Sequence, residues 1–212
     1  MRALVTGFEP FGGESINPSW LAVSRLQKQV AGVRVHTVEL PCSYTHSAGL
    51  LGAAIAEVRP DIVLCVGQAG GRSELCLERV AINVQDARIR DNDGNQPIDV
   101  AVIEGGPAAH FGTLPIKACV AEMRKAGLPA AVSNTAGTFV CNHIFYVLMD
   151  MANRHPTPLR GGFLHIPFAP EQVILSGAPS VAIDDVVRGI EIILATSAAR
   201  TSDIHTVEGR IS

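Results

Sequence analysis

Short segments that are apolar on both faces alternate with segments of helical period through most of this chain. The clearest apolar segment is D-I-V-L-C-V-G at residues 61–67, which follows Pro60 and precedes a polar turn. Segments of this kind are typical of parallel strands that helices cover on both faces. The alternation therefore predicts an α/β fold with a largely parallel central sheet between two layers of helices.

Local signals place the individual elements. Asn17 is a good N-cap and Pro18 a good first helical residue, which predicts a helix from there to about Val30, ended by Gly32. Strands are predicted at 3–6, 33–40, 61–67, 79–84, 130–133 and 162–166, and further helices at 47–58, 116–126, 139–153 and 184–198. The stretch 85–115 has little regular signal, and a run of this length is usually functional or an interface arm.

Composition and charge argue against several classes of protein. Hydrophobic residues make up 47% of the 212 residues and charged residues 17%, which argues against disorder. The net charge of −3 and the lack of a basic stripe argue against nucleic-acid binding. No stretch resembles a membrane span, and the first apolar run is too short for a signal-peptide core, so we expect a cytoplasmic location. No repeat or linker is visible, which predicts one domain over residues 1–212.

The chain contains an odd number of widely spaced cysteines and no C-x-x-C pair. This pattern indicates neither a disulfide framework nor a zinc ribbon. In a reducing compartment most of these residues are expected to be small buried thiols. The five are Cys42, Cys65, Cys76, Cys119 and Cys141.

Four predicted strand ends carry unusual residues. In open α/β sheets, sites form where the carboxyl ends of the strands meet. Here these ends supply a cysteine, two histidines, a glutamate, a glutamine, three phenylalanines and many glycines. The stretches are G-F-E-P-F-G-G, G-Q-A-G-G-R with the following glutamate, T-A-G-T-F-V-C-N-H and F-L-H-I-P.

Cys141 lies at the start of the helix predicted at 139–153. The thiolate is the reactive form of cysteine, and the partial positive charge and free N–H groups of a helix N-terminus favour it. Burial statistics alone favour the plainer interpretation, a buried thiol. If Cys141 is a nucleophile, His165 in F-L-H-I-P is the candidate base. His143 lies about 200° around the helix from Cys141 on ideal geometry, which favours a structural role for it.

The remaining partners of such a site stay open on the residues alone. Glu78 could orient the imidazole as a third member, with Glu74 and Asp86 as rivals. A metal site from Cys141 and the two histidines is disfavoured because C-x-H matches no usual ligand spacing. The glycine-rich loops lack the G-K-[ST] of a phosphate-binding loop and are not G-x-G-x-x-G.

Several long motifs in order resemble the type I pyroglutamyl peptidases, also called pyrrolidone carboxyl peptidases. The resemblance runs from near Leu4 to about Ala198, nearly the full length. The stretches that carry it are T-G-F-E-P-F-G-G-E-S-I-N-P-S-W, D-I-V-L-C-V-G-Q-A-G-G-R, L-E-R-V-A-I-N, A-R-I-R-D-N-D-G-N-Q-P, S-N-T-A-G-T-F-V-C-N-H-I-F-Y and G-G-F-L-H-I-P.

The resemblance implies a three-layer α/β/α sandwich and a cytoplasmic cysteine peptidase that removes N-terminal pyroglutamate from peptides. The family's nucleophile, histidine and glutamate fall on Cys141, His165 and Glu78. The apolar pocket for the pyrrolidone ring falls on Phe8, Phe11, Phe139 and Val140, with Gln68 at the lactam and Arg88 near the oxyanion. The resemblance also implies a homo-oligomer, often a tetramer, and no cofactor, metal, nucleic acid or membrane as partner.

One departure from the family pattern is visible. Related sequences commonly have A-R-I-P-D-N, and this chain has Arg90 at the proline position, which adds a charge near Arg88 and loosens the backbone constraint there. Two rival functions stay open at this point. One is a binding module that holds a neutral peptide end without turnover, and the other is a nucleoside- or phosphate-handling enzyme that uses the glycine loops.

Overall fold

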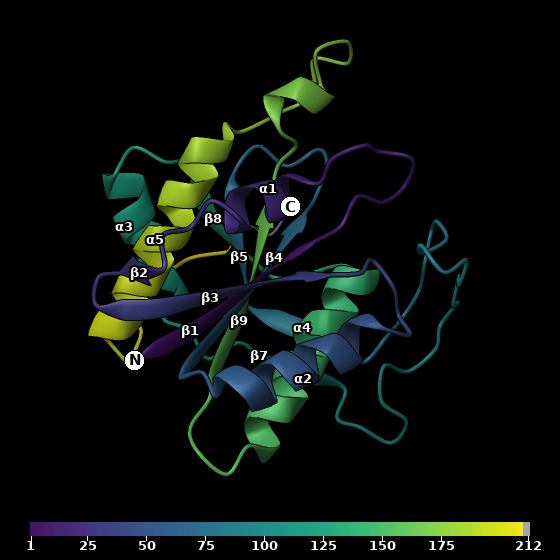
Figure 1. Ribbon diagram of the computed structural model, residues 1–212, viewed down its shortest axis with the longest axis horizontal. Helices are drawn as coiled ribbons and strands as arrows, with labels where there is room; N and C mark the ends of the chain where they lie inside the picture. Colours follow the sequence, from purple (N-terminus) through teal and green to yellow (C-terminus); the bar gives the residue numbers. More distant parts are fainter. Residues whose placement is uncertain (210–212) are drawn as a thin grey trace.

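The computed structural model describes residues 1–209 and contains a seven-stranded sheet in the order β2-β3-β1-β4-β9-β5-β8 (Figure 1). The last three residues of the predicted domain lie outside the described part. The sheet strands are β1 (Arg2–Phe8), β2 (Gln29–Val30), β3 (Val33–Leu40), β4 (Ile62–Gln68), β5 (Leu75–Glu78), β8 (Ala130–Ser133) and β9 (Arg160–Ile166). A second sheet pairs β6 (Val80–Ile82) with β7 (Ala109–Phe111).

Most neighbouring strands of the large sheet are parallel, as predicted. β1 pairs in parallel with both β3 and β4, β4 with β9, and β5 with β8. The pairs β2–β3 and β5–β9 are antiparallel. The carboxyl ends of β1, β4 and β9 therefore meet at one edge of the sheet, where the sequence had placed its unusual residues.

Two hydrophobic cores lie on opposite faces of the sheet, because successive strand side chains point to opposite sides. Ile62 and Leu64 belong to one core and Val63 and Cys65 to the other. The first core lies under α1 (Pro18–Val23), α3 (Ile116–Lys125) and α5 (Ile183–Ala199), and the second under α2 (Ser47–Val58) and α4 (Val140–Arg154) (Figure 1). The fold is a three-layer α/β/α arrangement, which confirms the predicted class.

The first helix is much shorter than predicted. α1 ends at Val23, and Gln29–Val30 forms β2 instead of the last helical turn. Val30 pairs with Val33 across a two-residue turn in which Ala31 and Gly32 both have positive φ angles, 47° and 80°. This geometry suits a tight hairpin. Gly32 therefore makes a strand-to-strand turn rather than a helix end.

The predicted strand 79–84 is only partly correct. β6 occupies part of it, but the strand that enters the main sheet is β5, which the sequence analysis missed. β5 has only four residues, L-C-L-E, and directly follows the glycine turn, so its local signal is weak. This strand lies between β9 and β8, and its last residue is Glu78.

The long stretch 85–115 is held by specific hydrogen bonds although it has little secondary structure. Gln85 and Val100 form an isolated bridge. The Asp91 carboxylate accepts hydrogen bonds from the backbone N–H groups of Tyr44, Asp93 and Asn95. Within residues 1–209, no helix is long and apolar enough to cross a membrane.

Candidate active site

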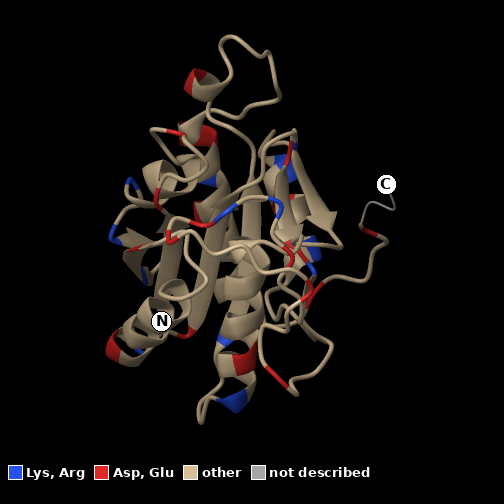
Figure 2. Ribbon diagram, turned by 90° about the vertical axis from the view of Figure 1, so that its right-hand side faces the viewer, with Lys and Arg blue, Asp and Glu red and all other residues tan. Residues whose placement is uncertain are grey.

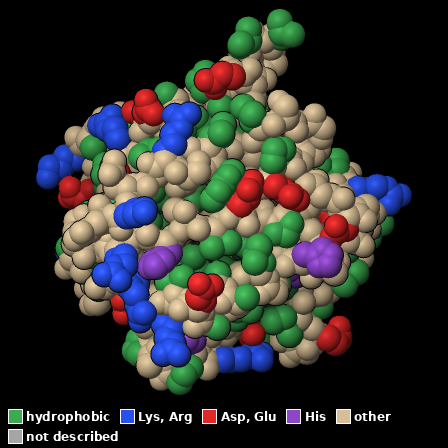
Figure 3. All heavy atoms as spheres, viewed as in Figure 1, with side chains coloured by type: hydrophobic (Ala, Val, Ile, Leu, Met, Phe, Trp, Pro, Cys, Tyr) green, Lys and Arg blue, Asp and Glu red, His purple; other side chains and the backbone are tan. Residues whose placement is uncertain are grey.

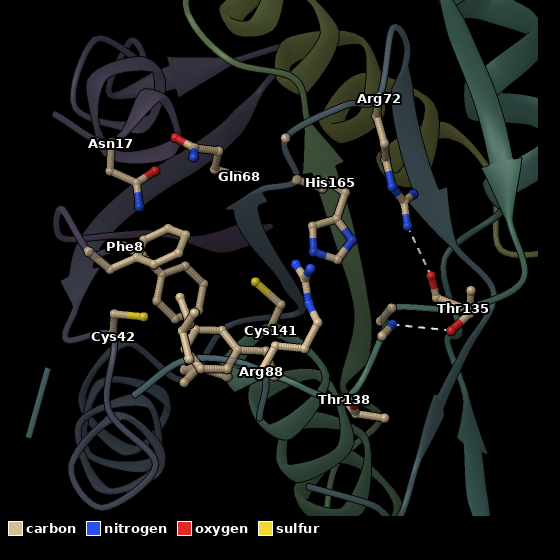
Figure 4. A pocket seen from close by; sticks show the side chains of 18 of the residues that line it. Phe8, Asn17, Cys42, Gln68, Arg72, Arg88, Thr135, Thr138, Cys141 and His165 are labelled. Atoms are coloured by element: carbon tan, nitrogen blue, oxygen red, sulfur yellow. Dashed lines mark hydrogen bonds between the residues drawn. The ribbon is translucent and has the colours of Figure 1, made fainter. Parts of the chain in front are cut away.

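A cavity of about 720 Å³ opens at the carboxyl edge of the sheet. Its walls come from the loops that follow β1, β3, β4 and β9, from the stretches 86–89 and 135–138, and from the first turn of α4. Of the nine predicted site residues, all but Glu78 line it (Figure 4). These eight are Phe8, Phe11, Gln68, Arg88, Phe139, Val140, Cys141 and His165.

Cys141 is the second residue of α4, and its sulfur packs directly on Gly67 of β4. A Cβ atom on residue 67 would lie 2.7 Å from Cys141 Sγ and 2.9 Å from Phe163 Cζ, so only glycine leaves room for the sulfur. Gly67 is the register partner of His165 in the β4–β9 pair. The thiol is therefore held next to His165, and Figure 4 shows the sulfur and the imidazole side by side at the cavity.

The environment of Cys141 keeps the thiol protonated in the free protein. Burial raises the pKa of this thiol well above its usual range, and the neighbouring Cys42 and the Glu78 carboxylate act in the same direction. The Arg72 guanidinium acts in the opposite direction. The sequence analysis expected the helix N-terminus to favour the thiolate, but in the folded chain desolvation is the larger influence. A nearby base is therefore required for attack.

Glu78 contacts the His165 ring directly. The His165 Nδ1 atom is 2.7 Å from Glu78 Oε1, and both side chains are buried. The contact arises because β5 runs antiparallel to β9, with Cys76 opposite His165. Among the three carboxylates considered from the sequence, Glu78 is the one seen to bond this ring, while Asp86 is exposed at the cavity.

Aromatic side chains form the apolar wall of the cavity. The ring centroids of Phe11 and Phe139 are 6.1 Å apart, and Tyr44 meets Phe139 edge-on at 5.7 Å. Phe8 is buried and packs 6.5 Å from Phe163. Such walls suit a flat, neutral group better than a charged one.

Gln68 stands at the end of β4 and presents an amide at the cavity. Its Oε1 accepts a hydrogen bond of 3.0 Å from Gln172 Nε2. Gln172 in turn accepts from the backbone N–H of Ala169. The Gln68 carbonyl is thus engaged, and its NH₂ group is the part available to a bound molecule.

His143 does not line the cavity. Gln85 Nε2 lies 3.0 Å from its Nδ1, and its ring stacks edge-on against Tyr44 at 5.5 Å. Burial lowers the pKa of His143 to about 4, so the ring is neutral near pH 7. These contacts agree with a structural position. Among residues 1–209, no group of three His, Cys, Asp or Glu side chains is arranged to hold a metal ion.

The two arginines of A-R-I-R differ in their placement. Arg88 lines the cavity, and Figure 4 shows its guanidinium extended toward Cys141 and His165. Arg90 is exposed and donates a hydrogen bond of 2.7 Å to the Gly94 carbonyl within its own loop. The extra charge expected near the site is therefore directed away from the cavity.

Sequence reasoning assigned no role to several residues that line the cavity. Arg72 is the most prominent, because it contacts Glu78 directly at 2.8 Å. Its only sequence signal was its place at the end of G-Q-A-G-G-R. The others include Cys42, Thr135, Thr138 and Phe168.

A helix N-terminal cysteine beside a carboxylate-bound histidine, at the carboxyl edge of an α/β sheet, is the arrangement used by thiol hydrolases. The comparisons with known proteins are more specific. A family model described as pyroglutamyl peptidase matches residues 1–200. Pyrrolidone-carboxylate peptidases from Bacillus licheniformis and Streptomyces coelicolor are 50% and 54% identical to this chain. These matches cover 100% and 98% of this chain and 99% and 98% of the two relatives.

Solved structures give the same result. The pyroglutamyl peptidase I of Bacillus amyloliquefaciens superposes with a TM-score of 0.95 at 49% identity, covering 97% of this chain and 99% of that one. The pyrrolidone carboxyl peptidase of Thermococcus litoralis superposes with a TM-score of 0.92 at 35% identity, covering 97% of this chain and 99% of that one. The chain therefore belongs to the pyroglutamyl peptidase family and is a peptidase, which confirms the resemblance seen in its motifs.

Proposed function

We propose that this chain removes an N-terminal pyroglutamyl residue from peptides by thiol catalysis. The observation that carries the proposal is the Glu78 contact to His165, next to Cys141, at a cavity with aromatic walls. The names of its relatives support the same activity. Glu78 orients the imidazole, His165 acts as base and acid, and Cys141 is the nucleophile.

The walls of the cavity fit the chemistry of a pyroglutamyl end. This end is a flat, neutral lactam without a free α-amine, so a site that recognises charge has nothing to bind. Phe8, Phe11, Phe139 and Val140 supply apolar surface for the ring. The NH₂ group of Gln68 donates to the lactam carbonyl, since its own oxygen is engaged by Gln172.

The reaction proceeds through an acyl-enzyme. His165 takes the proton of the Cys141 thiol as the sulfur attacks the pyroglutamyl carbonyl, because the buried thiol does not ionise by itself. The free N–H groups in the first turn of α4 and the guanidinium of Arg88 stabilise the oxyanion. His165 then gives its proton to the leaving amine and activates the water that releases pyroglutamate.

The direct test is hydrolysis of a pyroglutamyl amide by the wild type and by Cys141→Ala. We expect the variant to lose at least about 10³-fold in kcat while it remains folded, because the nucleophile is removed. Cys119→Ala is the matched control: Cys119 is also a buried thiol, but it packs against Ser197 and Ile193 on the other face of the sheet. Wild-type turnover in Cys141→Ala would refute the mechanism, and selective alkylation of Cys141 by iodoacetamide would support it.

The organisation of the protein belongs to the same proposal. We take residues 1–212 as one peptidase domain that acts in the cytoplasm on peptides and needs no cofactor, nucleic acid or membrane. Acidic and basic residues are interspersed along the chain rather than gathered in blocks of one sign (Figure 2). Light scattering of the purified protein tests the predicted tetramer.

A homo-oligomer is supported by the segment that follows β9. Ile174 and Leu175 in this segment are 79% and 100% exposed. Figure 3 shows hydrophobic side chains at the tip of this protrusion. Large exposed apolar side chains that project from the surface are typical of contact sites.

A further inference from the structure

The Glu78 carboxylate is completely buried, with an exposed fraction of 0%. Its Oε1 atom contacts His165, while its Oε2 atom is buried and has no hydrogen-bond partner among residues 1–209. An ionised carboxylate in such a place is costly unless a cation and hydrogen bonds compensate it. His165 contacts only the Oε1 atom, so it does not by itself satisfy this carboxylate.

The compensating cation is Arg72. Its Nη1 donates to Glu78 Oε1 at 2.8 Å, the same oxygen that contacts His165, and its Nη2 donates to the Thr135 carbonyl at 3.0 Å (Figure 4). Thr135 belongs to the loop that leads into Cys141. One guanidinium therefore connects the carboxylate that contacts the histidine to the backbone before the cysteine.

The glycines before Arg72 explain how the side chain reaches this position. Gly71 has a φ of 86°, a conformation that favours glycine. A Cβ on Gly70 would lie 2.3 Å from the Phe168 ring, so this residue must also be small. The A-G-G-R motif is thus a tight turn after β4 that directs the arginine back toward the end of β5.

We propose that Arg72 is a positioning residue of the active site: it pairs with and orients the Glu78 carboxylate, and through Glu78 it orients His165 toward Cys141. The inference rests on the proposed thiol peptidase function. A planar guanidinium suits the task because its N–H groups point in fixed directions and satisfy two acceptors at once. Lysine would keep the charge but not this two-acceptor geometry.

The pH dependence of Cys141 alkylation reports the effect of Arg72 in the protein without substrate. Arg72 is the neighbour that lowers the pKa of the Cys141 thiol, against burial. Removing this cation therefore shifts alkylation of Cys141 to higher pH. The ionisable groups around the sulfur are Cys42, Tyr44, Cys65, Arg72, Glu78, Arg88 and His165.

The experiment compares Arg72→Gln and Arg72→Lys with Arg79→Gln. Arg79 is the matched control, because it also tethers the loop before Cys141, through a hydrogen bond of 2.8 Å to Asn134 Oδ1. Its guanidinium donates to Asn134 and to the Glu208 carbonyl rather than to Glu78. For Arg72→Gln we expect kcat on a pyroglutamyl amide to fall by about 10²-fold with little change in KM, and Arg72→Lys to recover part of it. Arg79→Gln should stay within about threefold of the wild type.

The pH dependence separates positioning from simple tethering. We expect the acid limb of the kcat/KM profile and the alkylation of Cys141 to move to higher pH in Arg72→Gln but not in Arg79→Gln. Equal losses in both variants with unchanged pH profiles would overturn the inference. If the wild type does not turn over, the proposed function fails, and the alkylation profile still tests Arg72.

A double variant tests whether Arg72 acts through Glu78. In a Glu78→Gln background the buried charge is gone, so Arg72→Gln should add no further loss of kcat and no further loss of thermal stability. If Arg72→Gln alone does not fold, folding of the double variant supports charge compensation. Failure of both to fold would show that Arg72 is needed whatever the charge of Glu78, which contradicts the proposal.

Discussion

The two longest helices, α4 and α5, pack on opposite faces of the same sheet and differ in what covers their outer sides. α5 is a surface helix that buries one stripe, including Val186, Ile190 and Leu194, and leaves the rest toward solvent. α4 is buried at every position from Asn142 to Asp150. The difference shows that a helix can be placed inside the molecule when irregular chain covers it.

The cover over α4 is β6, β7 and the stretch between them. Asn142 accepts a hydrogen bond from the Ile82 N–H and donates to the Ile82 and Val84 carbonyls. Tyr146 donates to the Pro107 carbonyl at 2.7 Å. The long segment without regular signal therefore covers the helix that carries Cys141.

Among the changes that test how α4 is packed, the largest expected effect comes from filling the space under the Cys141 sulfur. Gly67→Ala places a methyl group 2.7 Å from Cys141 Sγ and 2.9 Å from Phe163 Cζ, so the sulfur must move away from His165. Since small displacements of reacting groups are costly, we expect kcat/KM on a pyroglutamyl amide to fall by about 10²-fold or more.

The matched control for this substitution is Gly49→Ala in α2. A Cβ on Gly49 meets nothing within 4 Å, and the position is exposed. Alanine at such a helix position stabilises by about 0.5–1 kcal/mol and should leave turnover unchanged. Unchanged activity in Gly67→Ala would contradict the packing described for Cys141.

A second prediction compares the buried polar contacts of the two helices. Asn142→Ala removes three part-buried hydrogen bonds between α4 and its cover and leaves the Ile82 and Val84 backbone groups without this partner, so we expect a loss of about 3 kcal/mol in the free energy of unfolding. Ser197→Ala in α5 removes only a long contact to Cys119 Sγ at 3.8 Å and should cost less than about 1 kcal/mol. Urea unfolding of both variants measures the difference, and equal losses would contradict it.

The smallest predicted effect concerns pH. Burial lowers the pKa of His143 in α4 to about 4, below its ordinary value of 6.5. Between these two pKa values, His143 is protonated in the unfolded chain but neutral in the folded chain. The contribution of neutral His143 to the free energy of unfolding is fully present above pH 6.5 and is lost as the pH falls toward 4. Between pH 7 and pH 5 we expect the free energy of unfolding to fall by about 2 kcal/mol through His143 alone.

His143→Gln isolates this contribution because glutamine keeps a polar amide and does not titrate. Unfolding curves of the wild type and the variant at a series of pH values should converge in the acid range. The stability gap between the two proteins should therefore shrink as the pH falls. A gap that stays constant with pH would show that His143 is not buried in its neutral form.

Much of the fold could be read from local patterns. The boundaries of α2 and β8 follow from apolar period, glycine and proline alone, and α4 and α5 were placed within one or two residues. The misses have a common cause. β2 and β5 are short strands that exist because neighbouring strands pair with them, and their own residues carry little signal.

The sequence by itself determined the α/β class, the family and the residue types gathered at the strand ends, because ordered motifs and hydrophobic period are properties of the chain. Only the tertiary structure decided that Cys141 rests on Gly67, that Glu78 bonds His165 and that Arg72 bonds Glu78. These contacts join residues on different elements. They depend on strand order, register and burial, which no local pattern encodes.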